Sequence, residues 1–322
     1  MDVYRDPLGL DEPPRGCVLS IGNFDGVHVG HQAVLRHAVA RSAELESFAA
    51  ALTLDPHPVK LLRPREAPLL VTTLEQRLQL IGRTGMHATL VVPFTHRLAR
   101  SPAESFVRDV LVGRLGIREV YIGANFRFGA DRGGDVDLLS RMGRELGFVA
   151  DSAPTVEVGG AIVSSTRVRE TVADGRVGEA RELLGRFTFV DGKVLEGKRL
   201  GRTLGFPTLN IEWQNELIPK QGVYISAVHI PSFRRTFAAV TNIGVRPTVY
   251  ENSVVTMESH LLDFTGDVYG EPVRLYFLDR LRDERQFTST SQLMVQIRSD
   301  VDATRAWFDD RPVGELDLVL PI

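Results

Sequence analysis

CVLSIGNFDGVHVGHQAVLRHAVARSAELE (17–46) decides the fold of the first half of the chain. Its apolar start (17–24) predicts a buried strand, and the amphipathic stretch 31–46 predicts a helix behind that strand. One helix and three strands continue the pattern, namely Leu74–Gly82, SFAAALTL (47–54), ATLVVPF (88–94) and EVYIG (119–123). Strands separated by helices are typical of βαβ units with right-handed crossovers, so we predict an α/β domain with a Rossmann-like parallel sheet. Ligands of such sheets bind at the carboxyl ends of the strands.

The second half of the chain has strands without intervening helices. They are FTFVDGKVLEG (187–197), GVYISAVHI (222–230), FAAVTNIG (237–244), VVTMESHLLDF (254–264) and EPVRLYFLDRLR (271–282). Gly-, Pro- and Asn-rich turns separate them, which predicts an antiparallel barrel or sandwich. A terminal helix is predicted by a capping box at Ser289 and Gln292 and by an apolar stripe of Leu293, Ile297, Val301 and Phe308. The boundary falls at Gly185–Phe187, giving domains 1–185 and 186–322.

Composition excludes several classes of protein. The 322 residues contain 38 Lys and Arg against 41 Asp and Glu, a net charge of −3 without the basic excess of a nucleic-acid binder. The only cysteine, Cys17, rules out an internal disulfide and a cysteine-based zinc site. Residues 1–16 hold acids and prolines where a signal peptide needs an apolar core, and no apolar run approaches the ~18 residues of a spanning helix. We expect a cytoplasmic protein with neither nucleic-acid nor membrane partners.

The strongest local signal for chemistry is GNFDGVHVGH (22–31), between the first strand and the first helix. Gly26 and Gly30 allow a tight turn and close approach to a ligand. His28 and His31 flank a helix N-terminus, where free N–H groups favour phosphate and an imidazole can donate to an oxygen that gains charge. Taken alone, two histidines three residues apart also suit a structural role or a metal site.

Three further segments follow strands or open a helix. LTLDPHP (52–58) predicts a proline-fixed turn. GANFRFG (123–129) offers an amide and two aromatic rings, which suit either core packing or stacking on a planar heterocycle. SSTRVR (164–169) suits either a simple helix cap or a triphosphate held by hydroxyls, backbone N–H groups and arginine.

A second glycine-rich constellation, GKRLGRTLGFPTLN (197–210), opens the second half. It is not a Walker A loop, because no Gly-Lys-Ser/Thr follows and no helix begins there. Its glycines and basic residues suit phosphates, and Thr208 and Asn210 offer the hard oxygen ligands that Mg²⁺ prefers. A flexible basic hairpin before an edge strand is the alternative.

In this order the motifs of the first half resemble the HxGH nucleotidyltransferase superfamily, and specifically the adenylyltransferase domain of bifunctional riboflavin kinase/FAD synthetases. The only departure we note is Leu54, where the family's TFDPHP motif has Phe. The resemblance implies that His28 and His31 are catalytic. It implies an ATP site of Gly22, Phe24, Asp25, Gly26, His28, His31, Ser165, Thr166 and Arg169, and a flavin site of Asp55, His57, Asn125, Phe126 and Phe128.

The second half is similar to the riboflavin kinase domain of the same family, whose GxxxGxxxGFPTAN signature differs only by Leu209 for Ala. We expect Leu209 to pack on the opposite strand face. GVY (222–224), TNIGVRPT (241–248), ESHLLDF (258–264) and LRDERQF (281–287) also follow the family. The resemblance implies that Glu258 is the catalytic base and that Thr208 and Asn210 hold the metal. It implies an ATP site of Gly197, Lys198, Arg199, Gly201, Gly205, Thr208 and Asn210, and flavin contacts from Arg282 and Phe287.

The family resemblance spans residues 16–305 and implies an ATP- and Mg²⁺-dependent enzyme. The kinase half would convert riboflavin to FMN and the adenylyltransferase half would convert FMN to FAD. Two alternatives stay open at this point: an adenylyltransferase with another acceptor, and one half that senses flavin or nucleotide without turnover. A weak homo-oligomer is compatible with the sequence. Phe187 stands where the family has proline, away from both motifs.

Overall fold

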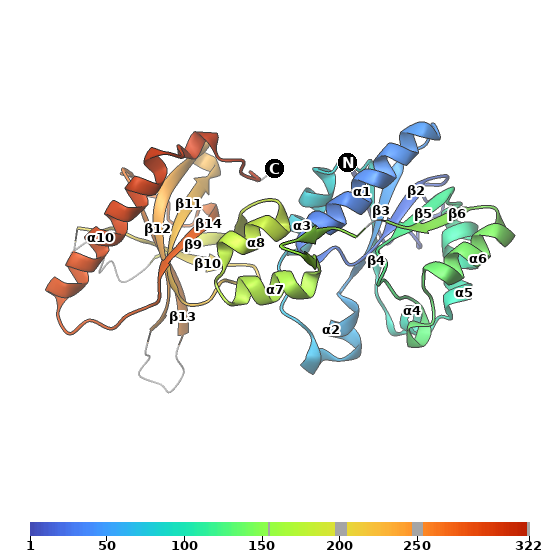
Figure 1. Ribbon diagram of the computed structural model, residues 1–322, viewed down its shortest axis with the longest axis horizontal. Coiled ribbons are helices and arrows are strands. Elements are labelled where there is room, and N and C mark those ends of the chain that lie inside the picture. Colours follow the sequence, from blue (N-terminus) through green and yellow to red (C-terminus); the bar gives the residue numbers. More distant parts are fainter. Residues whose placement is uncertain (154, 197–204, 247–253, 321–322) are drawn as a thin grey trace. The chain divides into compact units, whose positions relative to one another are not determined.

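The computed structural model describes residues 1–153, 155–196, 205–246 and 254–320. The chain forms two compact units, Met1–Ser165 and Thr166–Ile322. The first contains a six-stranded sheet and the second a closed six-stranded barrel (Figure 1). The predicted fold class is therefore confirmed. The domain boundary predicted at residue 185 stays a prediction.

The sheet of the first unit is entirely parallel, in the order β1-β4-β3-β2-β5-β6. Its strands are β1 (Asp2–Arg5), β2 (Val18–Ile21), β3 (Ala49–Asp55), β4 (Ala88–Pro93), β5 (Glu119–Ile122) and β6 (Val149–Ser152). The four central strands are buried runs and were predicted. The edge strands β1 and β6 were not, because their residues are mostly exposed and carry little apolar signal.

Helices cover both faces of this sheet. Val18 of β2 packs with Val34 and Ala38 of α1 (Val29–Glu44), whereas its neighbour Leu19 belongs to the core formed with η3 (Phe106–Arg114) and α6 (Val136–Leu146). The other helical elements are η1 (Asp25–Val27), α2 (Pro58–Leu62), η2 (Pro64–Glu66), α3 (Leu74–Gly82), α4 (His96–Ala99), α5 (Ala103–Ser105) and η4 (Ala130–Arg132). Two short strands, β7 (Glu157–Val158) and β8 (Ala161–Ile162), form a separate hairpin.

A buried carboxylate fixes α1 to the central strand β5. Both oxygens of Glu119 accept from the guanidinium of Arg41, at 3.0 and 2.6 Å, and the hydroxyl of Tyr121 donates to Glu119 Oε2 at 2.7 Å. The hydrogen bonds from Arg41 hold the pKa of Glu119 below its usual range, whereas burial raises the pKa of Tyr121 to about 12. The helix that carries His28 and His31 is thereby held in register on the sheet.

The barrel of the second unit has the closed strand order β10-β13-β12-β11-β14-β9. Its strands are β9 (Thr188–Leu195), β10 (Leu209–Trp213), β11 (Gly222–Ile230), β12 (Arg235–Arg246), β13 (Val254–Leu261) and β14 (Pro272–Arg282). Every pairing is antiparallel. The strand β10 completes the barrel. A strand was expected at Leu209, but its bounds were not predicted, because its five residues include two polar ones, Asn210 and Glu212.

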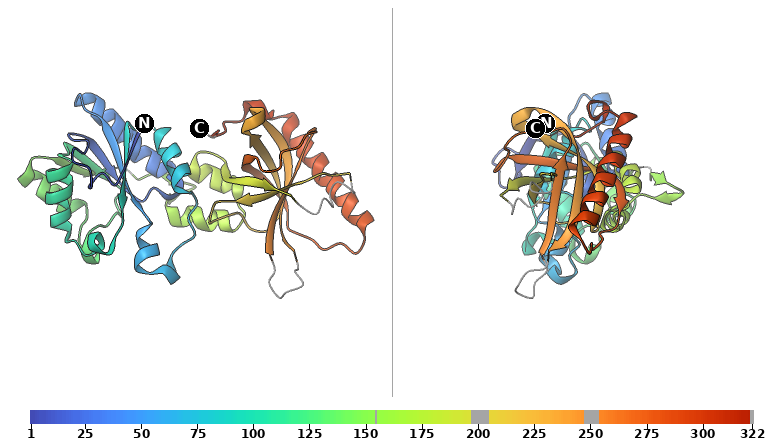
Figure 2. Two further views of the ribbon diagram at one scale, coloured as in Figure 1. Left: turned by 180° about the vertical axis from the view of Figure 1, so that it is seen from behind. Right: turned by 90° about the vertical axis from the view of Figure 1, so that its left-hand side faces the viewer.

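Among the described residues, three helices accompany the barrel: α7 (Ser165–Ala173), α8 (Val177–Leu184) and α10 (Thr290–Asp309). Figure 2 shows α10 along the outside of the barrel, where it contacts β11 and β12. Short turns η5 (Pro231–Phe233) and η6 (Val313–Glu315) complete the unit. Ser289 caps α10 as predicted, but the Gln292 side chain accepts from the Thr288 hydroxyl.

The buried side of α10 combines polar and apolar residues. Asp300 and Thr304 are buried, and the predicted apolar stripe at Leu293, Ile297, Val301 and Phe308 is half-buried. Arg282 of β14 binds the Asp300 carboxylate with Nε at 3.0 Å and Nη2 at 2.7 Å. A two-pronged ion pair therefore holds the helix in addition to the predicted stripe.

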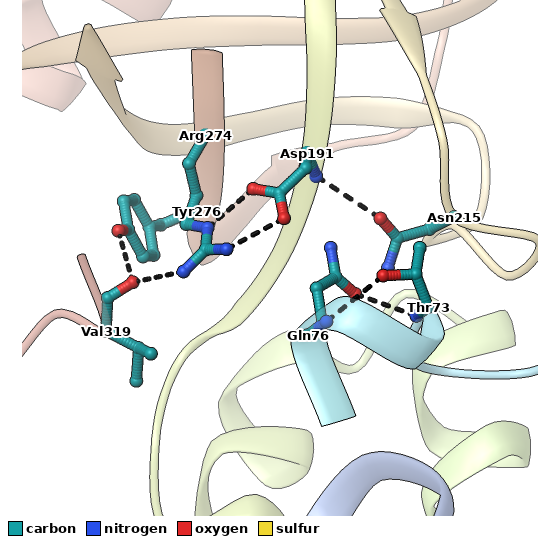
Figure 3. Close-up of polar contacts among 7 residues, drawn as sticks. All are labelled: Thr73, Gln76, Asp191, Asn215, Arg274, Tyr276 and Val319. Carbon is teal, nitrogen blue, oxygen red and sulfur yellow. Dashed lines mark hydrogen bonds and ion pairs between the residues drawn. The ribbon is translucent and has the colours of Figure 1, made fainter. Parts of the chain in front are cut away.

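Buried polar groups also tie down chain segments in both units (Figure 3). Arg274 binds Asp191 with two nitrogens and donates to the Val319 carbonyl at 2.7 Å, so the C-terminal segment is fastened to β14. In the first unit, Thr73 and Gln76 form the reciprocal capping box that starts α3. No helix in the described part of the chain is long and apolar enough to cross a membrane.

We expect Glu119→Gln to lower the free energy of unfolding of the first unit by about 1–3 kcal/mol, because it removes the charge that a half-buried guanidinium binds. The effect should be full at pH above about 4.3, the ordinary glutamate pKa, and should shrink as pH falls through the lower folded pKa of Glu119. Hydrogen exchange of α1 and β5 measures it, since both tryptophans, Trp213 and Trp307, lie in the second unit.

The matched control is Glu66→Gln. The side chains of the Arg63–Glu66 pair are 60% and 64% exposed, so this substitution should change the free energy of unfolding by less than about 0.5 kcal/mol. Equal effects of the two substitutions would contradict a stabilising role for Glu119.

Candidate active sites

The predicted adenylyltransferase motifs lie near the switch point of the sheet, between β2 and β5, where the strand order changes direction. Ile21 at the end of β2 pairs with Ile122 at the end of β5, so the loops that start at Gly22 and Gly123 leave the sheet side by side. The adjacent strand β3 ends at Asp55. This switch point is where open parallel sheets bind ligands.

The turn after β2 has an unusual backbone. Phe24, Gly26 and Val27 have φ of 51°, 78° and 38°, the left-handed region that residues other than glycine rarely adopt. A Cβ on Gly22 would lie 3.0 Å from the ring of Phe24, so a side chain at that position would have to displace the ring by a few tenths of an ångström. This conformation places residue 28 directly at the start of α1.

The buried carboxylate of Asp25 holds this turn in place. Its Oδ1 accepts from the backbone N–H groups of Val71 and Thr72, at 3.0 and 3.2 Å, and from the Thr72 hydroxyl. The Thr72 hydroxyl in turn accepts from Gly26 N, and Ser165 donates to the Asp25 carbonyl at 3.0 Å. The predicted site residues Asp25 and Ser165 are thus brought together, and Asp25 points into the protein as a positioning group.

The two predicted catalytic histidines lie together at the first turn of α1. Their rings are stacked with centroids 3.6 Å apart, and Phe24 packs edge-on against His31. His28 is the N-cap, and its Nδ1 accepts from His31 N at 3.3 Å. In neutral His28 the proton is therefore on Nε2, which makes that nitrogen a donor beside the free N–H groups of the helix start. A Cβ on Gly30 would lie 3.2 Å from the His28 ring.

The end of β3 adds a chain of polar contacts that the sequence analysis missed. His57 Nδ1 accepts from Val59 N, so its Nε2 carries a proton and faces the Asn23 amide at 3.3 Å. With the Asn23 amide turned so that its oxygen meets this proton, the otherwise unpaired Asn23 Oδ1 is satisfied. Thr53 donates to the Asn23 carbonyl and accepts from Arg77, which is 1% exposed. The sequence feature that could have identified these contacts is the charged residue Arg77, which stands at an apolar position of its helix.

The other predicted residues of the first site are less closely connected. Phe126 and Phe128 are stacked, 6.2 Å apart, half-buried against the core beneath, and Asn125 beside them is exposed. Thr166 and Arg169 follow Ser165 in α7 and belong to the second unit. Their roles stay predictions.

In the barrel, Glu258 lies in one row with two asparagines. It pairs directly with Asn210 of β10 on one side and with Asn242 of β12 on the other. Residues paired in this way share a face, so the three side chains are neighbours on the outer face of the barrel. Met257, Leu261 and Leu209 pack in or against the barrel core. The predicted orientation of Leu209 is confirmed, and Asn242 is a candidate that sequence reasoning missed.

A pocket of about 520 Å³ opens beside this row. Four of its lining residues are polar, namely Glu196, Asn210, Glu212 and Thr256. The others are Leu195, Ile211, Trp213, Val254, Val255 and Met257. Such a mixture suits a planar heterocycle with polar substituents. Glu196 also adjoins the predicted phosphate loop in sequence.

Only the end of that loop is described. Gly197, Lys198, Arg199 and Gly201 lie outside the described residues. Gly205 has φ of 83°, which requires glycine, and Thr208 follows just before β10. In the described ranges no group of three or more His, Cys, Asp and Glu side chains could hold a metal ion. Thr208 and Asn210 instead offer a hydroxyl and an amide oxygen two residues apart.

Arg282, predicted to contact flavin, is engaged elsewhere. Its guanidinium binds Asp300 as described above, and Nη1 donates to the Asp283 carbonyl at 3.0 Å. Phe287 lies near the same cation, 6.0 Å from ring centroid to guanidinium carbon. These contacts make Arg282 a residue that positions α10 and the following loop, and flavin binding by either residue stays a prediction.

Comparisons with known proteins agree with this arrangement of two sites. Family models match residues 10–167 as FAD synthetase and residues 184–308 as riboflavin kinase. The bifunctional riboflavin kinase/FMN adenylyltransferase of Pseudomonas fluorescens is 39% identical over 306 residues, covering 95% of this chain and 97% of that protein. The chain belongs to this family. It is therefore an enzyme of flavin cofactor biosynthesis with a nucleotidyltransferase and a kinase domain.

One further relative and one solved structure are similar to the chain over nearly its whole length. The Escherichia coli (strain K12) bifunctional riboflavin kinase/FMN adenylyltransferase is 37% identical, covering 96% of this chain and 98% of that protein. A solved structure described as a macrolide-efflux protein from Streptococcus pneumoniae is 28% identical with a TM-score of 0.86, covering 95% of this chain and all of that one. The nearly full coverage extends the likeness over both units.

We expect Asp25→Ala to speed hydrogen exchange at Val71 and Thr72 by about 10- to 100-fold, because it leaves their N–H groups without the acceptor that they have in the native turn. Mass spectrometry of peptides that cover residues 70–73 measures this. Asp151→Ala is the control, since that exposed carboxylate accepts from the adjacent Ser152 N. Unchanged exchange in Asp25→Ala would show that the carboxylate does not hold the turn.

Proposed function

We propose that this chain makes FAD from riboflavin in two ATP-dependent steps. Residues 186–322 phosphorylate riboflavin to FMN, and residues 1–185 join FMN to the adenylyl group of ATP. The observation that carries the proposal is the different chemistry of the two sites. One offers imidazole and helix N–H donors, and the other offers a carboxylate between two amides.

In the adenylyltransferase step, an oxygen of the FMN phosphate attacks the α-phosphorus of ATP. A new P–O bond forms as the bond to the β-phosphate oxygen breaks, and pyrophosphate leaves. The nucleophile is already an anion, so the site needs no base and works through alignment and charge neutralisation. The proton on His28 Nε2, together with His31 and the start of α1, would stabilise the transition-state phosphate.

In the kinase step, the nucleophile is the neutral 5′-hydroxyl of the ribityl chain, so a base is required. We assign Glu258 as the group that takes this proton while the hydroxyl oxygen bonds the γ-phosphorus and ADP leaves. Thr208 and Asn210 fit Mg²⁺, because both are hard oxygen donors and Asn210 is directly beside Glu258. When bound, this cation neutralises charge on the ATP phosphates. Asn210 also lines the 520 Å³ pocket, which we assign to the nucleotide.

We retain three finer expectations as proposals: a cytoplasmic location, no nucleic-acid partner and at most weak self-association. They are supported by the charge balance and by a single cysteine that is buried, where desolvation raises the thiol pKa to about 12. Its thiol is thus protonated and unreactive at neutral pH.

Chromatography of flavins after incubation with riboflavin and Mg-ATP tests the proposal. FMN followed by FAD, with pyrophosphate release tracking the second product, is the expected result. FMN that never becomes FAD would overturn the assignment of the first domain. No conversion at all would overturn both assignments.

For the first site, we expect His28→Ala to slow FAD formation from supplied FMN by about 10²–10³-fold, the scale of one lost transition-state donor. Riboflavin phosphorylation by the same preparation should be unchanged. His96→Ala is the matched control, because His96 is an exposed histidine of the same unit, in α4. A loss under threefold in His28→Ala, or an equal loss in His96→Ala, would refute the role.

For the second site, we expect Glu258→Gln to slow FMN formation by about 10²–10⁴-fold, because the amide cannot accept the hydroxyl proton. Riboflavin binding, measured by flavin fluorescence, and adenylylation of supplied FMN should persist. Glu271→Gln, in the turn before β14, should have normal turnover. Near-normal kinase rates in Glu258→Gln would rule out Glu258 as the base.

A further inference from the structure

Pro207 interrupts the backbone pairing of the barrel just before Thr208. The first paired residues of β10 and β13 are Leu209 and Ser259. A proline has no N–H to donate to a ladder, so the pairing cannot extend through it in the ordinary way. A side chain binds its carbonyl instead: His260 Nδ1 lies 2.8 Å from Pro207 O.

This contact fixes the protonation of one ring nitrogen. A carbonyl oxygen only accepts, so His260 Nδ1 carries a proton and donates it. The imidazole also packs edge-on against Phe206, with centroids 5.5 Å apart and ring planes at 81°. One side chain thus holds two consecutive residues of the segment that links Gly205 to β10.

The position of His260 in its strand connects it to the kinase site. It is two residues beyond Glu258, on the same outer face of β13. The carbonyl that it binds belongs to the peptide group joining Pro207 to Thr208. Holding that peptide group sets the direction of the Thr208 side chain, two residues before Asn210.

We propose that His260 is a positioning residue of the kinase site, which holds Thr208 in the orientation that binds Mg-ATP. The inference rests on the proposed function and deepens it. His260 acts through Pro207 and Thr208, and its effect is on binding of the nucleotide and its cation, with the flavin left unaffected.

Three substitutions separate the hydrogen bond from the ring contact. His260→Ala removes both, His260→Phe keeps a ring against Phe206 without the donor, and His260→Asn keeps an N–H close to the place of Nδ1. We expect the first two to raise KM for Mg-ATP by about three- to tenfold, the scale of one hydrogen bond, with KM for riboflavin unchanged. His260→Asn should recover most of the loss. An equal rise in both KM values, or no recovery in His260→Asn, would overturn the proposal.

A double-mutant cycle tests whether His260 acts through Thr208. Adding His260→Ala to Thr208→Ala should raise KM for Mg-ATP little beyond Thr208→Ala alone, because the group being positioned is already absent. Fully additive losses would overturn the proposal. Adenylylation of supplied FMN by each variant serves as the folding control.

Hydrogen exchange gives a readout that does not depend on the kinase reaction. The amides of Phe206 and Thr208 should exchange faster in His260→Ala and His260→Phe than in the parent chain. Unchanged exchange would show that His260 does not hold the segment. If the parent chain forms no FMN, the proposed function fails, while this measurement still decides the contact.

Discussion

The first active site depends on one buried carboxylate. The turn at Phe24–Val27 uses left-handed backbone at two residues with side chains, a conformation that costs on the order of 1–3 kcal/mol for each residue. Asp25 offsets this cost by accepting three hydrogen bonds from residues 71 and 72. Without the turn, α1 would start elsewhere and His28 would not be its cap. The stacked histidines, the glycine at position 30 and the clamp on Glu119 all depend on that start.

The barrel uses the same principle with different groups. In each unit part of the candidate site lies where regular backbone pairing ends, and there side chains and backbone groups can face a ligand. In the first unit the parallel strands end at their carboxyl edge and the helix start supplies N–H groups. In the second, Pro207 ends the pairing and His260 replaces one backbone bond with a side-chain bond. In each unit one polar side chain therefore hydrogen-bonds to the irregular backbone segment, Asp25 in the first and His260 in the second.

The sequence predicted the elements with strong periodicity. The buried strand at 18–21, the helix at Leu74–Gly82 and the strand at 222–230 have apolar patterns that admit only one assignment. It placed Leu209 on a strand but did not predict that β10 pairs on both sides, which is a tertiary property. It predicted the apolar stripe of α10 but not the Arg282–Asp300 pair that also holds this helix. Partners 18 residues or more apart in sequence leave no local pattern to find.

The candidate sites divide along the same line. Motifs supplied the candidate site residues, because their types and spacing can be read from short stretches of the sequence. Sequence reasoning missed the residues that support them, such as Thr53, Arg77 and His260, because each is defined by a partner that only the fold brings close.

The two candidate sites differ because the proposed nucleophiles differ. An anionic phosphate nucleophile needs only donors, and the first site turns its nearest carboxylate, Asp25, inward onto backbone N–H groups. A hydroxyl nucleophile needs a base, the role proposed for Glu258, which lies on the outer face of the barrel between two neutral amides.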